Sequence, residues 1–243
     1  MTRRAAPPFR VKICGVTRVE DAIAAVVAGA DAIGLNFVSG SPRRLSVIDA
    51  AAVAAATPRG VLRVGVFVAA DPAAIRATAK AVGLDAVQLH GLWPAGESST
   101  ADPPATCAAL AGMMVIRATR LAVADGRAAL EPTRGWINEA TALGHGPAMV
   151  LVDAAADRAA QAAGLGGSGK TADWALLRRA GALSVPIGLA GGLNADNVAA
   201  AIAASGAVAV DTASGVESGP GRKDHDAMRL FVSAALRSLS ERG

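Results

Sequence analysis

The chain has 243 residues, 52% of them hydrophobic and 18% charged, which is enough apolar material for one sizeable core. No apolar run is long enough to cross a membrane and no stretch near Met1 has the pattern of a secretion signal, so we expect no membrane partner. The net charge is +4, yet the basic residues are scattered and not interleaved with aromatic ones, which disfavours nucleic acid as a partner. Two cysteines are too few for a disulfide framework and predict a reducing, cytoplasmic compartment.

Short apolar runs alternate with longer alanine-rich amphipathic runs along the chain. The expected strand–helix pairs are 9–14 with 19–28, 32–37 with 47–56, 62–68 with 72–82, 86–89 with 101–111, 115–118 with a helix within 126–143, 149–152 with 173–180, 185–189 with 195–204, and 208–210 with 225–239. Helix stop signals at Gly29 and Gly83 and a start signal at Pro72 support these bounds. Eight pairs predict the α/β class and a single (β/α)8 TIM barrel over residues 1–243, with residues 1–8 as a flexible tail. An open, doubly wound sheet is the alternative.

Two connections are longer than the others. Residues 91–104 are rich in Pro, Gly and Ser and predict a surface insertion, whereas residues 154–171 end in glycines and predict a mobile lid. The second connection contains Gly164–Thr171, which matches the P-loop pattern G-x-x-x-x-G-K-[ST]. A P-loop follows its strand almost at once, but here eleven residues separate Val152 from Gly164. A nucleotide hydrolase therefore stays an alternative, and a lid over a bound substrate is favoured.

Polar residues gather at the carboxyl ends of the expected strands, where barrels of this class place their chemistry. They are Lys12, Cys14, Arg43, Gln88, His90, Asp153 and Asp211. Each has an ordinary explanation by itself: a free cysteine is usually a buried apolar residue, an aspartate often caps a helix, and an arginine is usually solvated. Their coincidence at one rim favours an active site.

Glycine-rich segments follow the last two expected strands, at residues 190–194 and 211–217. Glycine lets backbone N–H groups approach an anion closely, and these two loops often bind phosphate in TIM barrels. We therefore expect a phosphorylated small molecule as the ligand. The histidines and cysteines have no metal-ligand spacing, and no dinucleotide fingerprint follows the first strand, so neither a metal nor a cofactor is expected.

The chain also carries a series of short segments in a fixed order: 12–17 (KICGVT), 28–34 (AGADAIG), 41–43 (SPR), 64–68 (VGVFV), 87–91 (VQLHG), 166–174 (GGSGKTADW), 189–194 (LAGGLN), 211–217 (DTASGVE) and 221–224 (GRKD). In this order they resemble the phosphoribosylanthranilate isomerase family of tryptophan biosynthesis, from about Val11 to the C-terminus. The resemblance implies an isomerase that converts N-(5-phosphoribosyl)anthranilate to 1-(2-carboxyphenylamino)-1-deoxyribulose 5-phosphate by an Amadori rearrangement.

The same resemblance implies a role for each candidate residue. Cys14 would be the general base that takes the proton from sugar C2, and Asp153 the general acid that protonates the ring oxygen. Arg43 would bind the anthranilate carboxylate. The further substrate-binding residues would be Lys12, His90 and Asp211, and the phosphate would lie among Gly167, Gly191, Gly192, Ser214 and Gly215.

Both catalytic roles require a pKa that differs from the ordinary value of the side chain. A free thiol titrates near ~8.5, so the neighbouring Lys12 is expected to help form the thiolate, and Asp153 must hold a proton near neutrality. The chain departs from the family at Ala190 and Ala213, where serine is common, and in a longer segment 153–166. Asn36, a polar residue inside an expected strand, has no explanation from the sequence.

Two further functions stay open at this point. The chain could be a different phosphosugar enzyme with the same anion site, or a non-catalytic module that binds a phosphorylated ligand. We expect a monomer or a homodimer.

Overall fold

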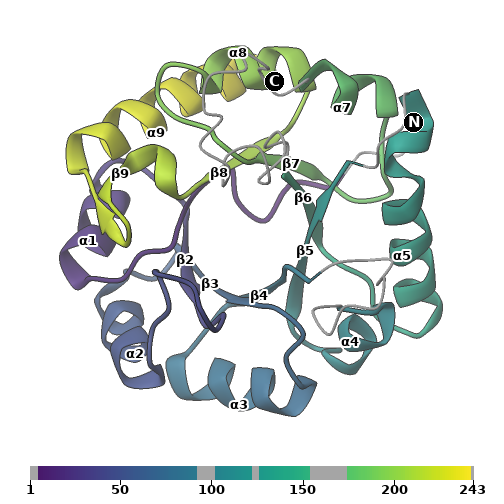
Figure 1. Ribbon diagram of the computed structural model, residues 1–243, viewed down its shortest axis with the longest axis horizontal. Helices are drawn as coiled ribbons and strands as arrows, with labels where there is room; N and C mark the ends of the chain where they lie inside the picture. Colours follow the sequence, from purple (N-terminus) through teal and green to yellow (C-terminus); the bar gives the residue numbers. More distant parts are fainter. Residues whose placement is uncertain (1–4, 92–101, 122–125, 154–173, 242–243) are drawn as a thin grey trace.

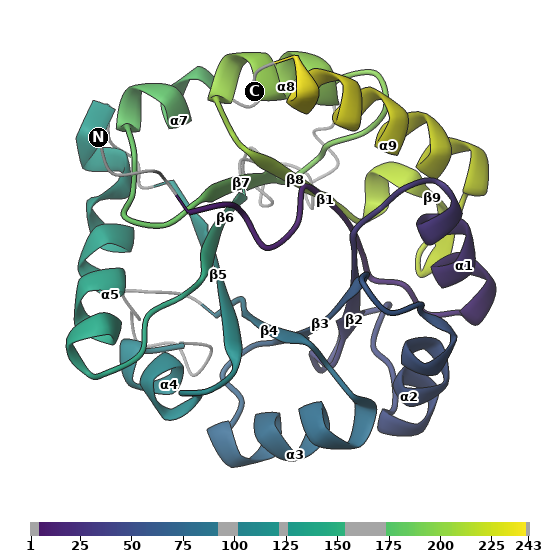
Figure 2. The same ribbon diagram turned by 180° about the vertical axis from the view of Figure 1, so that it is seen from behind.

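Eight parallel strands close into a ring in chain order, with β1 paired to both β2 and β8, and helices form an outer ring around them (Figures 1 and 2). The computed structural model describes residues 5–91, 102–121, 126–153 and 174–241. The closed ring confirms the predicted (β/α)8 barrel and rules out the open sheet. Within the described ranges, no helix is both long and apolar enough to span a lipid bilayer.

The strands of the ring are β1 (Val11–Cys14), β2 (Ala32–Asn36), β3 (Leu62–Phe67), β4 (Ala86–Leu89), β5 (Met114–Arg120), β6 (Met149–Asp153), β7 (Ile187–Ala190) and β8 (Ala209–Thr212). The α-helices around it are α1 (Val19–Val27), α2 (Val47–Ala56), α3 (Pro72–Val82), α4 (Pro104–Ala109), α5 (Glu131–Ala142), α7 (Trp174–Ala180), α8 (Val198–Ser205) and α9 (His225–Ser240). Short 3-10 helices cover Gly126–Leu130 and Ser214–Val216, and a small hairpin joins β9 (Glu217–Gly219) to β10 (Arg222–Lys223).

Helix α3 shows how local sequence fixes the ends of these elements. Asp71 caps it, because its carboxylate accepts hydrogen bonds from the backbone N–H groups of Ala73 and Ala74. Pro72 occupies the first turn, where its missing N–H leaves no hydrogen bond unmade, and Gly83 ends the helix in the left-handed conformation at φ 75°. The predicted bounds of α3 are therefore confirmed.

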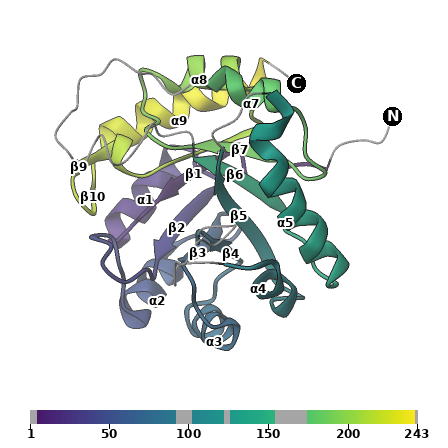
Figure 3. The ribbon, with the colours of Figure 1, turned by 45° about the vertical axis from the view of Figure 1, so that its right-hand side comes forward.

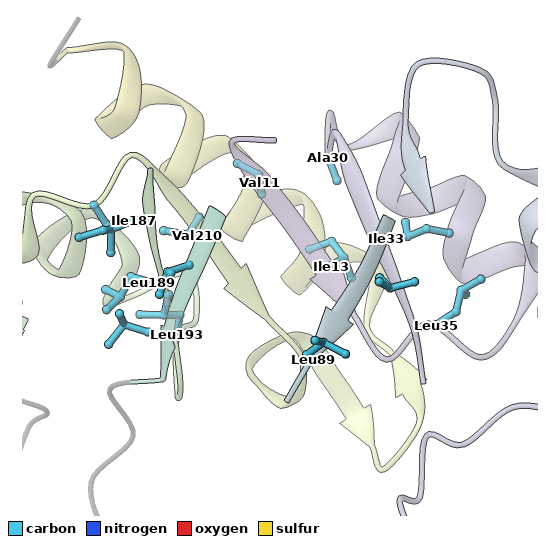
Figure 4. Packing of buried hydrophobic residues seen from close by; sticks show 14 of the residues in the cluster. Val11, Ile13, Ala30, Ile33, Leu35, Leu89, Ile187, Leu189, Leu193 and Val210 are labelled. Atoms are coloured by element: carbon cyan, nitrogen blue, oxygen red, sulfur yellow. The ribbon is translucent and has the colours of Figure 1, made fainter. Parts of the chain in front are cut away.

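Alternation along the strands separates two apolar layers. Val11 and Ile13 on β1 and Ile33 and Leu35 on β2 point out toward the helices, as Figure 4 shows, and belong to the larger core cluster. The second cluster fills the inside of the barrel with residues that include Phe9, Ala32, Val64, Ala86, Ile116, Met149, Leu151 and Ala209. Because side chains alternate, the inner positions closest to the carboxyl ends are free to carry polar groups.

The structure shifts several expected bounds. Strand β6 includes Asp153 and β8 runs on through Asp211, so both carboxylates lie at strand ends instead of in the loops beyond them. Strand β5 is longer than the expected 115–118. The β9–β10 hairpin was not predicted, since its few polar residues show no alternation, and it lies beside α1 (Figures 1 and 3). The expected lid at 154–171, most of the expected insertion and the first half of the expected tail lie outside the described residues.

Candidate active site

Residues from all eight strands or their following loops line one cavity of about 250 Å³ at the carboxyl ends of the barrel. The sequence-predicted residues among them are Cys14, Arg43, Gln88, His90, Asp153, Gly191, Gly192, Asp211 and Ser214. Lys12 and Gly215 do not line this cavity, and Gly167 lies outside the described residues. The fold thus brings together side chains that are up to 200 positions apart in the sequence.

Lys12 reaches the site through an ion pair. Its fully buried ammonium donates a hydrogen bond to Asp211 Oδ1 at 2.9 Å, from neighbouring positions on β1 and β8. Burial lowers the pKa of Lys12, but the charges of Asp211 and Cys14 outweigh it and raise that pKa above its ordinary value. Burial raises the pKa of Asp211, an effect that the Lys12 charge opposes. The lysine therefore stays protonated behind the cavity wall.

Cys14, half-buried at the end of β1, interacts electrostatically with three cations. The charge of Cys14 contributes to the raised pKa of Lys12 and of Arg43, and it opposes the burial that lowers the pKa of Lys223. Gly34 on β2 provides room for the thiol, since a Cβ there would approach Cys14 Sγ to 2.7 Å and Lys12 Cε to 3.2 Å. Cys14 therefore lines the cavity beside several positively charged side chains.

Arg43 forms a two-point ion pair that the sequence analysis did not foresee. Its Nε donates to Glu217 Oε1 at 2.7 Å and its Nη2 to Oε2 at 2.6 Å. Burial raises the pKa of Glu217, but its hydrogen bonds to Arg43 and Lys223 outweigh this and lower that pKa below its ordinary value. The only sequence signal for Glu217 is its place in the 211–217 segment.

Asn36 shapes the loop that carries Arg43. Its side-chain oxygen accepts from Val38 N at 2.7 Å, and its amide donates to Ser41 Oγ at 3.1 Å. Ser41 Oγ in turn accepts from Arg43 N at 3.2 Å. The side chain of Asn36 therefore adds hydrogen bonds to the backbone ones that shape this loop, which explains a choice that the sequence left unexplained.

A second cavity, of about 640 Å³, adjoins the first. The two share Asn36, Arg43, Val66, His90 and Ala118 among their lining residues. The larger cavity extends over the loop after β2 and the end of β5 as far as Pro132. Together they form a site with a glycine-lined end and a roomier end, and Arg43 lies where the two meet.

The loops after β7 and β8 are fastened to each other at the glycine-lined end. Thr212 Oγ1 donates to the carbonyl of Leu193 at 2.6 Å. Gly215 packs so tightly that a Cβ would lie 1.8 Å from the same carbonyl oxygen. Gly191 and Gly192 both adopt positive φ, 93° and 66°, which glycine accepts without strain. Backbone groups of both loops can therefore surround one small anion.

A buried carboxylate holds the loop that follows β4 next to His90. Asp102 is fully buried and accepts hydrogen bonds from the backbone N–H groups of Ala69 at 2.9 Å and Gly91 at 2.5 Å. Arg117 lies 3.9 Å from Asp102 and 4.9 Å from the ring centroid of Trp136. Burial lowers the pKa of Arg117 to about 10. This network was not predicted, and it links the loops after β3 and β4 to β5.

No group of three or more His, Cys, Asp or Glu side chains suited to a metal ion occurs among the residues that the structure describes. The expectation that no metal or cofactor is needed stays a prediction. The P-loop-like run Gly164–Thr171 falls outside the described ranges.

A closed (β/α)8 barrel with ionisable side chains at its carboxyl ends and glycine-rich loops beside them is typical of enzymes that act on phosphorylated sugars. The chain matches the family described as N-(5'phosphoribosyl)anthranilate (PRA) isomerase over residues 11–105 and 129–234. It belongs to that family, whose members are isomerases of tryptophan biosynthesis.

Individual relatives agree with this assignment. The N-(5'-phosphoribosyl)anthranilate isomerase of Myxococcus xanthus is 43% identical over 226 residues, 93% of this chain and 95% of the relative. The crystal structure of phosphoribosyl anthranilate isomerase from Thermotoga maritima superposes with a TM-score of 0.75 at 36% identity, covering 94% of this chain and 99% of that one. A structure of such an isomerase in complex with reduced 1-(o-carboxyphenylamino)-1-deoxyribulose 5-phosphate has a TM-score of 0.73 at 34% identity, with coverage of 94% and 99%.

Proposed function

We propose that Cys14 and Asp153 are the proton-transferring pair with which this chain isomerises N-(5'-phosphoribosyl)anthranilate. The observation that carries the proposal is that both side chains line the same cavity, from β1 and from β6, with the glycine loops of β7 and β8 between them. A thiol and a carboxyl group on one substrate space are what paired acid–base chemistry needs.

The chemistry divides between the two groups. Protonation of the furanose ring oxygen by Asp153 breaks its bond to C1 as the amine nitrogen supplies an electron pair, which leaves a protonated imine. The Cys14 thiolate then removes the proton from C2, and the electrons move into an enolamine that tautomerises to the ketone. No atom is gained or lost overall, and neither step draws on an outside oxidant.

The shape of the site supports one orientation of the substrate. The phosphate lies at the loops after β7 and β8, where Gly191, Gly192 and Ser214 line the cavity and Gly215 packs behind it. The aromatic ring extends into the larger cavity, and its carboxylate meets the guanidinium of Arg43. Asp211, held by Lys12, faces the sugar between these ends.

The direct test is a turnover assay on the purified full chain. We expect the fluorescence of the phosphoribosyl anthranilate adduct to fall on addition of the protein without added metal or nucleotide. Hydrolysis of ATP in the presence of Mg²⁺, with no loss of that fluorescence, would instead support a nucleotide hydrolase. Tight binding of reduced 1-(o-carboxyphenylamino)-1-deoxyribulose 5-phosphate without any turnover would support a binding module.

Gly215→Ala tests the phosphate end of this orientation. The new Cβ must displace the Leu193 carbonyl, so the loops after β7 and β8 separate. We expect KM for the phosphorylated substrate to rise at least about tenfold and the free energy of unfolding to fall by about 1–3 kcal/mol. Steady-state kinetics and chemical denaturation measure the two effects.

The matched control lies four residues further on. A Cβ at Gly219 would meet no atom within 4 Å, so Gly219→Ala is expected to keep KM near that of the unaltered protein. An unchanged KM in Gly215→Ala would contradict the placement of the phosphate.

A Thermotoga maritima relative is described as dimeric, and for this chain a monomer or a homodimer stays our prediction. We propose a cytoplasmic location, which the two free cysteines support because disulfide bonds are rare in that compartment.

A further inference from the structure

Glu217 is a nearly buried carboxylate that two cations share. Its side chain is 4% exposed, and besides Arg43 it accepts a hydrogen bond from Lys223 Nζ at 2.9 Å. The Lys223 ammonium also donates to the carbonyl of Ala213 at 2.9 Å. Charge-assisted hydrogen bonds with this geometry are strong and directional, so they fix the orientation of Glu217 as well as its position.

The way Glu217 holds Arg43 leaves one edge of the guanidinium available. Glu217 accepts from Nε and Nη2, whereas Nη1 has no hydrogen-bond partner among the residues that the structure describes. Gly15, at φ 69°, lies against the Arg43 side chain, because a Cβ there would come 3.2 Å from Cγ and closer still to Cδ. Arg43 lines both cavities, so its guanidinium borders the space that the proposed substrate orientation fills.

The hairpin that supplies Glu217 is itself anchored. Thr17 Oγ1 donates to the carbonyl of Gly221 at 2.5 Å, and the backbone N–H of Lys223 donates to Asp21 Oδ2 at 3.3 Å. Asp21 is fully buried on α1. Figures 1 and 3 show this hairpin beside α1, at the side of the barrel formed by the first strands. The hairpin that carries Glu217 is therefore held in place by contacts that do not involve Arg43.

We propose that Glu217 is a positioning residue for substrate specificity: by holding the Nε and Nη2 edge of Arg43, it presents Nη1 to the aromatic carboxylate of the substrate. This inference rests on the proposed orientation of the substrate. It assigns to the β9–β10 hairpin, which lies outside the ring of strands, the selection of a carboxylated aromatic group over an uncarboxylated one.

A pair of ligands tests the proposal without turnover. The first is reduced 1-(o-carboxyphenylamino)-1-deoxyribulose 5-phosphate, and the second is the same molecule without the aromatic carboxyl group. In the unaltered protein we expect the carboxylated ligand to bind more tightly. In Glu217→Gln the affinity for that ligand should fall about ten- to a hundredfold, with little change for the other, so that the preference is lost. Isothermal titration calorimetry measures all four affinities.

The variants are chosen to separate positioning from folding. Glu217→Asp keeps the charge but draws the carboxylate back by one methylene, so an intermediate preference is expected. Asp85→Asn is the matched control, because Asp85 forms the same two-point pair with Arg63, at 2.7 Å for both contacts, away from the site. That control should keep the full preference. Circular dichroism verifies the fold of each variant.

Three results would overturn the proposal. Equal weakening of both ligands in Glu217→Gln would show a merely structural role, and unchanged binding of both would show no role. An unaltered protein without any preference would remove the contact between Arg43 and the carboxylate. Failure of the proposed function is seen separately, as an absence of turnover in a protein that still discriminates between the two ligands.

Discussion

Cys14→Ser is expected to lower kcat for phosphoribosyl anthranilate by about 10²- to 10⁴-fold while the barrel stays folded, and Asp153→Asn should do the same. Serine keeps the size of the side chain but does not ionise near neutral pH, so position 14 no longer supplies a thiolate that can act as the base. Asparagine keeps the shape of the acid but has no proton to give to the ring oxygen. Because both substitutions impair proton transfer and keep the shape of the binding site, KM should change much less than kcat.

The chain contains its own control for the cysteine. Cys107 on α4 is fully buried, its thiol donates to the carbonyl of His145 at 3.3 Å, and burial raises its pKa to about 12. Cys107→Ser is therefore expected to keep a kcat near that of the unaltered protein. The rates come from the fluorescence assay, with denaturation curves run beside it. A kcat within a factor of a few of normal in Cys14→Ser or Asp153→Asn would remove that residue from its proposed role.

Lys12→Met is expected to reduce the free energy of unfolding by about 3–5 kcal/mol, because it leaves the buried carboxylate of Asp211 without its partner. The loss should depend on pH. Burial raises the pKa of Asp211, so once Lys12 is gone the native state binds that proton more tightly than the unfolded chain does. Stability of the variant should therefore be highest at acidic pH and fall as the pH rises through the pKa of the folded state.

A double variant separates stability from activity. In Lys12→Met/Asp211→Leu neither partner of the pair is left as a buried, unpaired charge, and we expect most of the lost stability to return while turnover stays low. Guanidinium denaturation at pH 5 and pH 8 gives the free energies. If Lys12→Met were as stable as the unaltered protein at pH 8, the Lys12–Asp211 pair would not make the predicted contribution to the free energy of unfolding.

The ring of strands was predictable because alternation and helix signals are local. Ala32 faces the inside of the barrel and Ile33 the helices, as the alternation of side chains along a strand requires. Asp71, Pro72 and Gly83 set the ends of α3 by contacts within a few residues. Bounds were less exact where a polar residue ends a strand, as at Asp153 and Asp211, since a carboxylate after an apolar run is typical of a turn.

The partners of the site residues were not predictable in the same way. The Arg43–Glu217 pair joins positions 174 residues apart, and the hydrogen bond from Gly91 N to Asp102 crosses between a loop and the start of α4. No periodicity marks such pairs. Asn36 is an unusual polar residue in an apolar strand, but its role is visible only in the folded loop, where its side chain forms hydrogen bonds to Val38 and Ser41.

The sequence by itself determined the alternation of eight strands and helices. That alternation places Cys14, Asp153 and the glycine-rich loops at the carboxyl ends of the parallel strands, on one side of the barrel. Those features depend on contacts between near neighbours in the chain, which leave a pattern in the order of residues. Only the tertiary structure decided that Lys12 is buried against Asp211 and that Glu217 holds Arg43. Such pairs depend on distances of about 3 Å across space, which chain order does not encode.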